Sequence, residues 1–233
     1  MRYTSAPPGL NTVFSCVRPV IFENKDHGFE SVAGTGFLIR FCGVTFFVTA
    51  KHVVSGYDLD AQRPSILYSL DGSAILPFSE MRKWTSVDTD DTDHVDIVIF
   101  KVDPEHVNQS SFKADRPFEV GPDNLLRSYS TGMALYFQGC PSATMNLDYE
   151  ARRHQLRFAS GDLIYRGPSP YRSVHTAKAA VLESCPDFDG LSGSPVFAIE
   201  NKMLASTRAA FAGMLIRATR RSNIMHFISA DSI

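Results

Sequence analysis

The sequence predicts an all-β protein of many short strands, arranged as a sandwich or as a pair of barrels. Its 15 glycines and 13 prolines interrupt β-rich runs rather than long runs with helical periodicity. Short strands at close spacing, with turn residues between them, are typical of these architectures. With 233 residues, 44% of them hydrophobic, the chain is long enough for one large domain or two compact lobes.

Composition narrows the class of partner. A formal net charge of -2 and a pI of about 6.4 give no electrostatic reason to bind nucleic acid or an anionic membrane. No apolar run approaches the ~20 residues that cross a bilayer, and the N-terminus lacks the apolar segment of a signal peptide. We therefore expect a cytoplasmic protein that binds neither membrane nor nucleic acid.

The cysteines favour the same compartment. They are widely spaced, without a C-x-x-C pair or a His at metal-ligand spacing, so we expect no metal and no cofactor. Reduced, buried thiols are the preferred interpretation, and one or two disulfides in an exported protein are the alternative. The four are Cys16, Cys42, Cys140 and Cys185.

The first lobe is predicted over residues 10–110. Phe41-Cys42-Gly43 forms the turn of one hairpin, and Asp71-Gly72 is the strongest local hairpin signal. The strands expected here are 13–22, 34–40, 44–50, 65–70, 73–78, 82–87 and 96–102.

The second lobe is predicted over residues 125–233, after a proline-containing connection at 103–125 that lacks periodicity. Turns are expected at Ser160-Gly161-Asp162 and at Glu200-Asn201-Lys202. The strands expected here are 133–137, 156–159, 163–165, 179–182, 196–199, 211–217 and 224–229.

Ser192 lies between Leu191 and Gly193, at the start of an apolar run. A serine hydroxyl is a weak nucleophile that needs a base, a group that orients the base, and donors for the oxyanion. The glycines at 190 and 193 would let the amides of Gly190 and Ser192 point at one spot as those donors. Taken alone, the pattern equally fits a glycine-rich turn that enters a strand.

His52 and Asp96 would supply the base and its orienting group. His52 directly follows a predicted strand, and its imidazole can take a proton from serine and return it to a leaving group. Asp96 opens a strand that should be buried, whereas the acidic residues before it read as a solvated loop. Asp93 is the alternative orienter if Asp96 lies elsewhere.

The chain order of the three residues is His, Asp, Ser, each at a strand boundary, which differs from subtilisin and from the α/β-hydrolases. The segments that contain His52 and Asp96, together with Gly190-Leu191-Ser192-Gly193-Ser194-Pro195, resemble the motifs of trypsin-like, chymotrypsin-fold serine peptidases. Gly34-Thr35-Gly36-Phe37 most resembles intracellular bacterial members related to the HtrA type. The resemblance implies a chymotrypsin-like double β-barrel with the active site in the inter-barrel cleft. It also implies a catalytic triad of His52, Asp96 and Ser192.

The sequence departs from that family at three points. Leu191 replaces an acidic or amide residue, so no salt bridge from a newly cut N-terminal amine can order the oxyanion loop. The loop is then either preformed or ordered by a substrate or partner. Ser194 replaces a glycine, a small-for-small change expected to be tolerated. The sequence stops shortly after the last predicted strand, which predicts a form without a PDZ domain.

The resemblance also implies where a specificity pocket would lie. An acid at Asp187 or Asp189 that pointed inward would favour a basic substrate side chain, whereas His226 would favour an acidic one. The candidate pocket residues are Asp187, Asp189, Met214, Ala218 and His226.

Three functions fit this reading. The first is a serine endopeptidase that hydrolyses peptide bonds in a protein or peptide substrate through an acyl-enzyme. The second is a protease-fold binding or scaffold module whose site is latent or unused, and Leu191 motivates it. The third is an esterase that uses the same residues on small acyl substrates.

Overall fold

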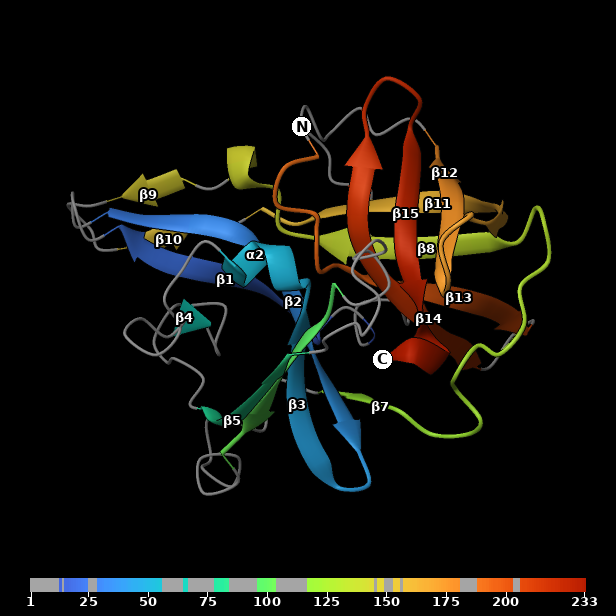
Figure 1. Cartoon of the computed structure of the whole chain (residues 1–233), viewed down its shortest axis with the longest axis horizontal. Helices are drawn as coiled ribbons and strands as arrows, with labels where there is room; N and C mark the ends of the chain where they lie inside the picture. The colour runs from blue at the N-terminus through green and yellow to red at the C-terminus, as the bar shows by residue number, and fades with distance from the viewer. Residues whose placement is uncertain are drawn as a thin grey trace.

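The structure is a computed structural model. It describes residues 13, 15–24, 29–55, 65–66, 78–83, 96–103, 117–144, 146–148, 153–155, 157–180, 188–202 and 206–233. The described chain is built mainly of β-strands, which form two lobes that lie side by side in Figure 1. The predicted all-β fold class is therefore confirmed, whereas the residue bounds given above for the two lobes stay a prediction.

The described residues of the N-terminal lobe form a largely antiparallel sheet and the short helix α2. The sheet order is β4-β1-β2-β3-β6-β5, and β7 pairs with β2 in parallel. Helix α2 follows β3 directly. The elements are β1 (Val17–Asn24), β2 (Phe29–Phe41), β3 (Val44–Thr49), α2 (Lys51–Ser55), β4 (Ser65–Ile66), β5 (Phe78–Lys83), β6 (Val98–Val102) and β7 (Phe118–Glu119).

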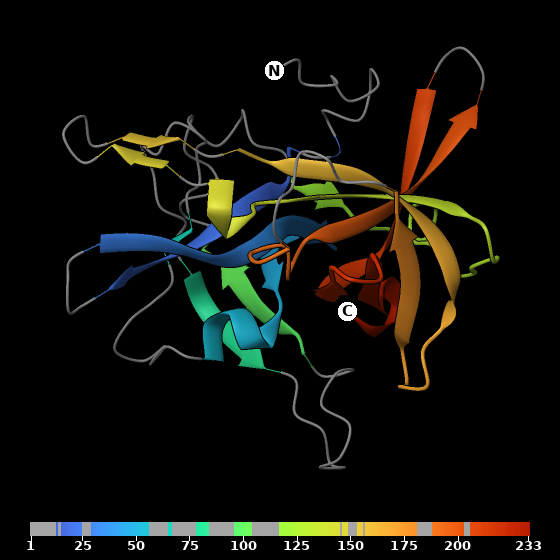
Figure 2. The ribbon, with the colours of Figure 1, turned by 90° about the horizontal axis from the view of Figure 1, so that it is seen from above.

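The C-terminal lobe is a closed barrel in the order β11-β12-β15-β14-β13-β8. It is the yellow-green to red part of Figure 1, and Figure 2 shows it from above. The barrel strands are β8 (Ala134–Gly139), β11 (Ala159–Pro168), β12 (Val174–Ala179), β13 (Pro195–Lys202), β14 (Ser206–Thr219) and β15 (Ile224–Ser229). Outside the barrel are η3 (Ser142–Thr144), a two-stranded sheet of β9 (Asn146–Asp148) and β10 (Arg153–Gln155), and η4 (Ala230–Ser232).

Local turn chemistry explains one predicted hairpin. β2 and β3 pair from Gly36 with Thr49 to Phe41 with Val44. The two residues between the strands, Cys42 and Gly43, have φ of 49° and 79°. Two consecutive positive φ values are what a two-residue hairpin needs to match the twist of its strands. The hairpin predicted around Asp71-Gly72 lies outside the described residues.

Two predicted turns are wrong. Ser160-Gly161-Asp162 lies inside β11, where Gly161 pairs with Phe137 of β8. Glu200-Asn201-Lys202 lies inside β13, where Asn201 pairs with Thr207 of β14. In both segments a full ladder of backbone hydrogen bonds to a neighbouring strand outweighs the local preference of Ser, Gly, Asp and Asn for turns.

Two clusters of buried apolar side chains form the core of the protein. One fills the C-terminal barrel, and the other contains residues of both lobes and therefore forms their common core. In the shared cluster Phe37 of β2 packs against Phe211 of β14, with ring centroids 5.4 Å apart. Phe118 of β7 packs against Phe197 of β13 at 4.9 Å. Aromatic pairs at such distances contribute about 1 kcal/mol beyond the area that they bury, so the lobes form one packed unit.

None of the helices in the described part of the chain has the length and apolar character that crossing a bilayer requires. Cys16, Cys42 and Cys140 are free thiols; Cys16 and Cys140 are buried, as expected, whereas Cys42 is exposed in the turn between β2 and β3. Burial raises the pKa of the Cys16 thiol to about 12, so this cysteine is a protonated core residue.

Candidate functional site

His52 lies in α2 and is held by Asp96 in two ways. The backbone N–H of His52 donates to Asp96 Oδ1 at 2.9 Å, and the ring Nδ1 lies 2.6 Å from Asp96 Oδ2. The Lys51 N–H also donates to the Asp96 carbonyl at 3.2 Å. With its Nδ1 proton directed at the carboxylate, the ring presents Nε2 as a basic nitrogen.

Strand register brings these two residues together. Thr49, the last residue of β3, pairs with Val98, the first residue of β6. The chain segments on either side of this pair therefore meet at one edge, which sets His52 beside Asp96. The His52 side chain is 49% exposed and that of Asp96 is 16% exposed. The His52 imidazole faces solvent, whereas the Asp96 carboxylate is mostly covered.

The Ser192 hydroxyl has a different partner. It donates to the Ile216 carbonyl of β14 at 3.0 Å. Among the described residues, no hydrogen bond joins this hydroxyl to His52. The carbonyl of Ile216 is available because β14 has a register shift against β15 between Leu215 and Arg217. The structure thus joins His52 to Asp96 and Ser192 to Ile216.

Gly34 separates α2 from residues 188–194, which form the candidate nucleophile loop. A β-carbon added at Gly34 would lie 2.7 Å from the Val53 side chain and 3.2 Å from the Ser192 carbonyl oxygen. Val53 is the neighbour of His52 in α2. The helix and the nucleophile loop therefore approach each other across Gly34, where any larger residue would push them apart.

Hydrogen bonds to neighbouring carbonyls orient the two amides proposed as oxyanion donors. A trans peptide is planar, so its N–H points away from its C=O. Ser142 N–H donates to the Asp189 carbonyl at 2.9 Å and so fixes the peptide that carries the Gly190 N–H. Ser194 N–H donates to the Leu191 carbonyl at 3.0 Å and fixes the peptide that carries the Ser192 N–H.

Glycine is required at position 190. Its φ is +87°, and a β-carbon there would lie 2.6 Å from both the Cys140 carbonyl oxygen and the Ser142 nitrogen. Leu191 is 1% exposed and belongs to the core of the C-terminal barrel. The residue beside the serine is therefore anchored by apolar packing, where an acidic residue would need a charged partner.

The candidate pocket residues differ in burial and location in the structure. Asp187 lies outside the described residues, and Asp189 is exposed. Met214 is fully buried in the cluster shared by the lobes, whereas Ala218 packs partly buried against the barrel core. His226 is half-buried, and its Nδ1 is buried with no hydrogen-bond partner among the described residues. Burial, and then the nearby Arg217, lower the pKa of His226.

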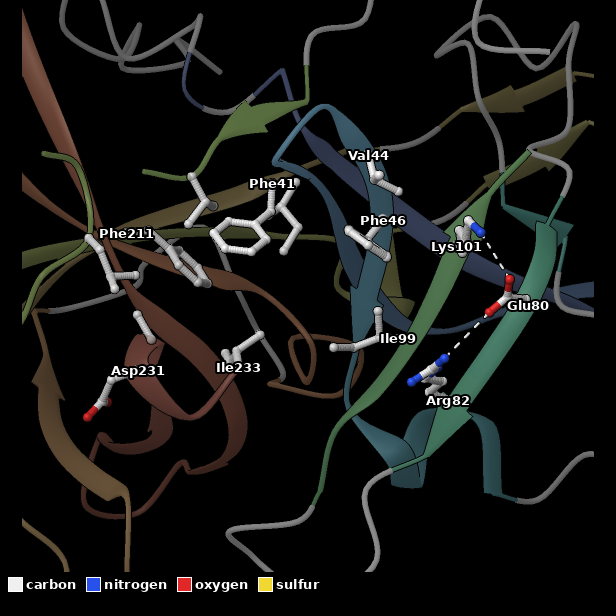
Figure 3. Close-up of a pocket in the computed structure, with 14 residues that line it drawn as sticks. Phe41, Val44, Phe46, Glu80, Arg82, Ile99, Lys101, Phe211, Asp231 and Ile233 are labelled. Carbon is white, nitrogen blue, oxygen red and sulfur yellow. Dashed lines mark hydrogen bonds and ion pairs between the residues drawn. The ribbon is translucent and has the colours of Figure 1, made fainter. Parts of the chain in front are cut away.

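A separate apolar pocket of about 570 Å³ lies elsewhere between the lobes. In Figure 3, Phe46 and Ile99 from the N-terminal sheet lie on one side, and Phe211 and Ile233 lie on the other. At its polar edge Lys101 donates to Glu80 at 2.9 Å and lowers the pKa of that carboxyl group. None of His52, Asp96 and Ser192 lines it. This pocket is therefore distinct from the candidate site.

The described residues contain no group of three or more His, Cys, Asp or Glu side chains that could hold a metal ion. Two groups that contact the nucleophile loop were missed by reasoning from the sequence. One is the Ile216 carbonyl, which no side-chain pattern encodes. The other is the hydroxyl of Thr35, whose place in Gly34-Thr35-Gly36 was the available signal.

No family model matches the sequence, and no curated protein matches it. Solved structures do match over nearly the whole chain. A scabies mite inactivated protease paralogue is 15% identical, with 97% of this chain and 93% of that chain covered and a TM-score of 0.58. A thermostable serine protease, AL20, from an extremophilic microorganism is 13% identical, with 94% and 92% covered and a TM-score of 0.56.

A Glu endopeptidase solved in complex with MPD is 14% identical, with 99% of this chain and 89% of that chain covered and a TM-score of 0.55. Similarity at this level of identity shows the fold. The chain therefore has the trypsin and chymotrypsin fold of serine proteases, which confirms the predicted resemblance at the level of architecture.

Proposed function

We propose that this protein is a serine endopeptidase. Ser192 is the nucleophile, His52 is the general base and acid, and Asp96 orients His52. The observation that carries the proposal is the double contact of Asp96 with the backbone and ring of His52, across Gly34 from the Ser192 loop. Such a contact selects the imidazole tautomer that accepts a proton at Nε2.

In the proposed reaction, Ser192 Oγ attacks the carbonyl carbon of the scissile peptide while His52 takes the hydroxyl proton. The amides of Gly190 and Ser192 then donate to the developing oxyanion. The C–N bond breaks as His52 returns the proton to the leaving amine, which leaves an ester on Ser192. A water molecule, deprotonated by His52, hydrolyses this ester and restores the serine.

Before attack the Ser192 hydroxyl has to leave the Ile216 carbonyl. A rotation about the Cα–Cβ bond of Ser192 does this without a change in the backbone. The cost is one neutral hydrogen bond, about 1 kcal/mol, which is small beside the barrier lowering that a triad supplies. The observed contact is thus compatible with a resting nucleophile.

An activity-based fluorophosphonate probe tests the proposal. We expect it to label Ser192 in the wild-type protein and to leave Ser192→Ala unlabelled, because the alanine has no oxygen to attack phosphorus. Ser194→Ala is the matched control, since the Ser194 hydroxyl is buried without a hydrogen-bond partner among the described residues and its loss removes no bond. A well-folded wild-type chain that is never labelled would sink the proposal.

The second candidate function is a binding or scaffold module that does not use the site. Two observations favour it. The Ser192 hydroxyl is bonded to Ile216 rather than to His52, and one structural neighbour is described as an inactivated protease paralogue. This function predicts that Ser192→Ala leaves the biological phenotype intact. Loss of the phenotype in a folded Ser192→Ala protein would count against it.

A peptide-library cleavage profile separates the endopeptidase from an esterase that uses the same residues. It also reports which substrate side chain precedes the scissile bond. A basic preference would point to Asp187 or Asp189, and an acidic preference would point to His226. Replacement of the acid by the corresponding amide residue, or of His226 by Gln, should then weaken that preference.

A further inference from the structure

Thr35 connects the N-terminal lobe to the nucleophile loop. It lies in β2, opposite Pro19 of β1, and is fully buried. Its hydroxyl donates to the Gly190 carbonyl at 2.6 Å, a contact between residues that are 155 positions apart. Its own N–H donates to the Ser192 carbonyl at 2.9 Å. One residue therefore holds the loop on both sides of Leu191.

The position of Thr35 is itself fixed. The Cys140 N–H donates to the Thr35 hydroxyl oxygen at 2.8 Å, so that oxygen both accepts and donates. The Thr49 hydroxyl donates to the Thr35 carbonyl at 2.6 Å. Both of these contacts are buried. Such buried hydrogen bonds are costly to break, because each buried donor or acceptor left without a partner lowers the stability of the fold by about 1–3 kcal/mol.

Every carbonyl from Asp189 to Ser192 has a donor. Ser142 and Ser194 supply two of the donors, and Thr35 supplies the other two, to Gly190 and to Ser192. Planar trans peptides transmit these bonds to the amides of the loop. The bonds from Ser142 and Ser194 orient the candidate oxyanion donors, the N–H groups of Gly190 and Ser192, whereas the bonds from Thr35 orient the peptides between and after them, which carry the N–H groups of Leu191 and Gly193.

The loop packs directly against Thr35, with no space between them for a side chain. A β-carbon at Gly193 would lie 1.8 Å from the Thr35 carbonyl oxygen. A β-carbon at Gly139 would lie 3.1 Å from the Thr35 hydroxyl and 3.0 Å from Leu191. Thr35, Leu191 and the glycines at 139 and 193 therefore form one tight contact.

We propose that Thr35 is a positioning residue that holds the nucleophile loop in its reactive conformation from the N-terminal lobe. This inference rests on the proposed peptidase function and deepens it. Because buried Leu191 carries no charge, the hydroxyl of Thr35 and the apolar anchor of Leu191 replace a charged tether. The oxyanion loop is then ordered in the folded chain before any substrate or partner binds.

The test compares three variants at two readouts. Thr35→Val keeps the shape and removes the hydroxyl, and Thr35→Ser keeps the hydroxyl and removes the methyl group. Thr45→Val is the matched control, because Thr45 is also buried in the N-terminal sheet but its hydroxyl accepts from Arg40 Nε at 3.2 Å. The readouts are the rate of fluorophosphonate labelling of Ser192 and hydrogen exchange of the amides in residues 188–194.

We expect Thr35→Val to slow labelling by about 10²-fold, the loss that a misplacement of reacting groups by about 1 Å produces. With a peptide substrate the loss should fall on kcat, with KM little changed. Exchange in the loop should rise, whereas Thr35→Ser should recover most of the labelling rate and Thr45→Val should change neither readout. If Thr35→Val does not fold, Thr35→Cys, with a weaker donor of similar size, must label more slowly than Thr35→Ser.

The outcomes separate the two proposals. If the wild-type chain labels, and Thr35→Val labels at the same rate with unchanged exchange in the loop, the positioning role is wrong and the peptidase proposal stands. If the folded wild-type chain never labels, the peptidase proposal fails and the positioning role fails with it. Equal slowing in Thr45→Val would also overturn the role, since the effect would then be one of general stability.

Discussion

The two halves of the candidate site are held by different kinds of contact. His52 is an exposed residue of a short helix, and its side chain is fixed by one carboxylate. The Ser192 loop is fixed by backbone hydrogen bonds from both lobes, by buried Leu191, and by glycines without space for a β-carbon. Changes to the base half should therefore affect activity alone, whereas changes to the loop half should also affect stability.

The largest effect is expected from a change in the half of the site that contains His52 and Asp96. Asp96→Asn should lower kcat by about 10⁴-fold, as in triads of this geometry. An asparagine that donates to Nδ1 would leave the His52 proton on Nε2, so the ring could not act as a base. The check is kcat by peptide hydrolysis beside a urea unfolding curve, with Asp123→Asn in an exposed turn as the control. A large loss of stability would contradict the comparison.

The next largest effect is expected from a change in the half of the site that contains the Ser192 loop. Gly193→Ala should destabilise the fold by about 3 kcal/mol or more, because positive φ strain adds to a collision with backbone. Gly132→Ala is the matched control, since Gly132 has a φ of +88° but nothing within 4 Å of an added β-carbon. Its free energy of unfolding should fall only by the cost of the backbone strain, about 1 kcal/mol. Equal unfolding free energies for the two variants would refute the contact argument.

A smaller effect concerns the barrel that carries the loop. His175 stacks against both Tyr129 and Phe227 and shares a 2.7 Å hydrogen bond with the Tyr165 hydroxyl. Burial lowers the pKa of His175 and outweighs the nearby Asp231, which raises it. The unfolded chain then binds a proton more readily than the folded chain, so stability present above about pH 6.5 is lost as the pH falls.

The measurement is the free energy of unfolding from urea curves between pH 7.5 and 5. His175→Gln keeps a hydrogen-bonding group for Tyr165 but does not titrate, so its stability should depend less steeply on pH than that of the wild type. Identical slopes for the two proteins would show that His175 does not contribute to the acid sensitivity of the barrel.

The smallest effect lies away from both halves. Phe41 lines the apolar pocket and is 53% exposed. Phe41→Ser should change the labelling rate of Ser192 less than about 2-fold, because an exposed substitution is worth within about 0.5 kcal/mol. Measurement of that rate sharpens the comparison. A change of more than 10-fold would mean that the pocket is coupled to the site.

The sequence predicted the contact between His52 and Asp96 but not several of the strand boundaries. His52 and Asp96 were singled out because each lies where a strand begins or ends, and the structure places them in contact. The strand boundaries around Ser160-Gly161-Asp162 were wrong because a local turn preference carries no information about the strand that pairs beside it. The partner of Ser192 was beyond prediction, since it is a backbone carbonyl exposed by a register shift.

By itself the sequence determined the all-β class, the chain order of the three candidate residues and the need for glycine around Ser192. Those features depend on residue type and local backbone freedom, which sequence patterns record. Only the tertiary structure decided that Thr35 contacts Gly190, that Leu191 is an apolar anchor, and that the Ser192 hydroxyl rests on Ile216. These contacts join segments far apart in the chain, so they exist only once strand register and packing of the two lobes are set.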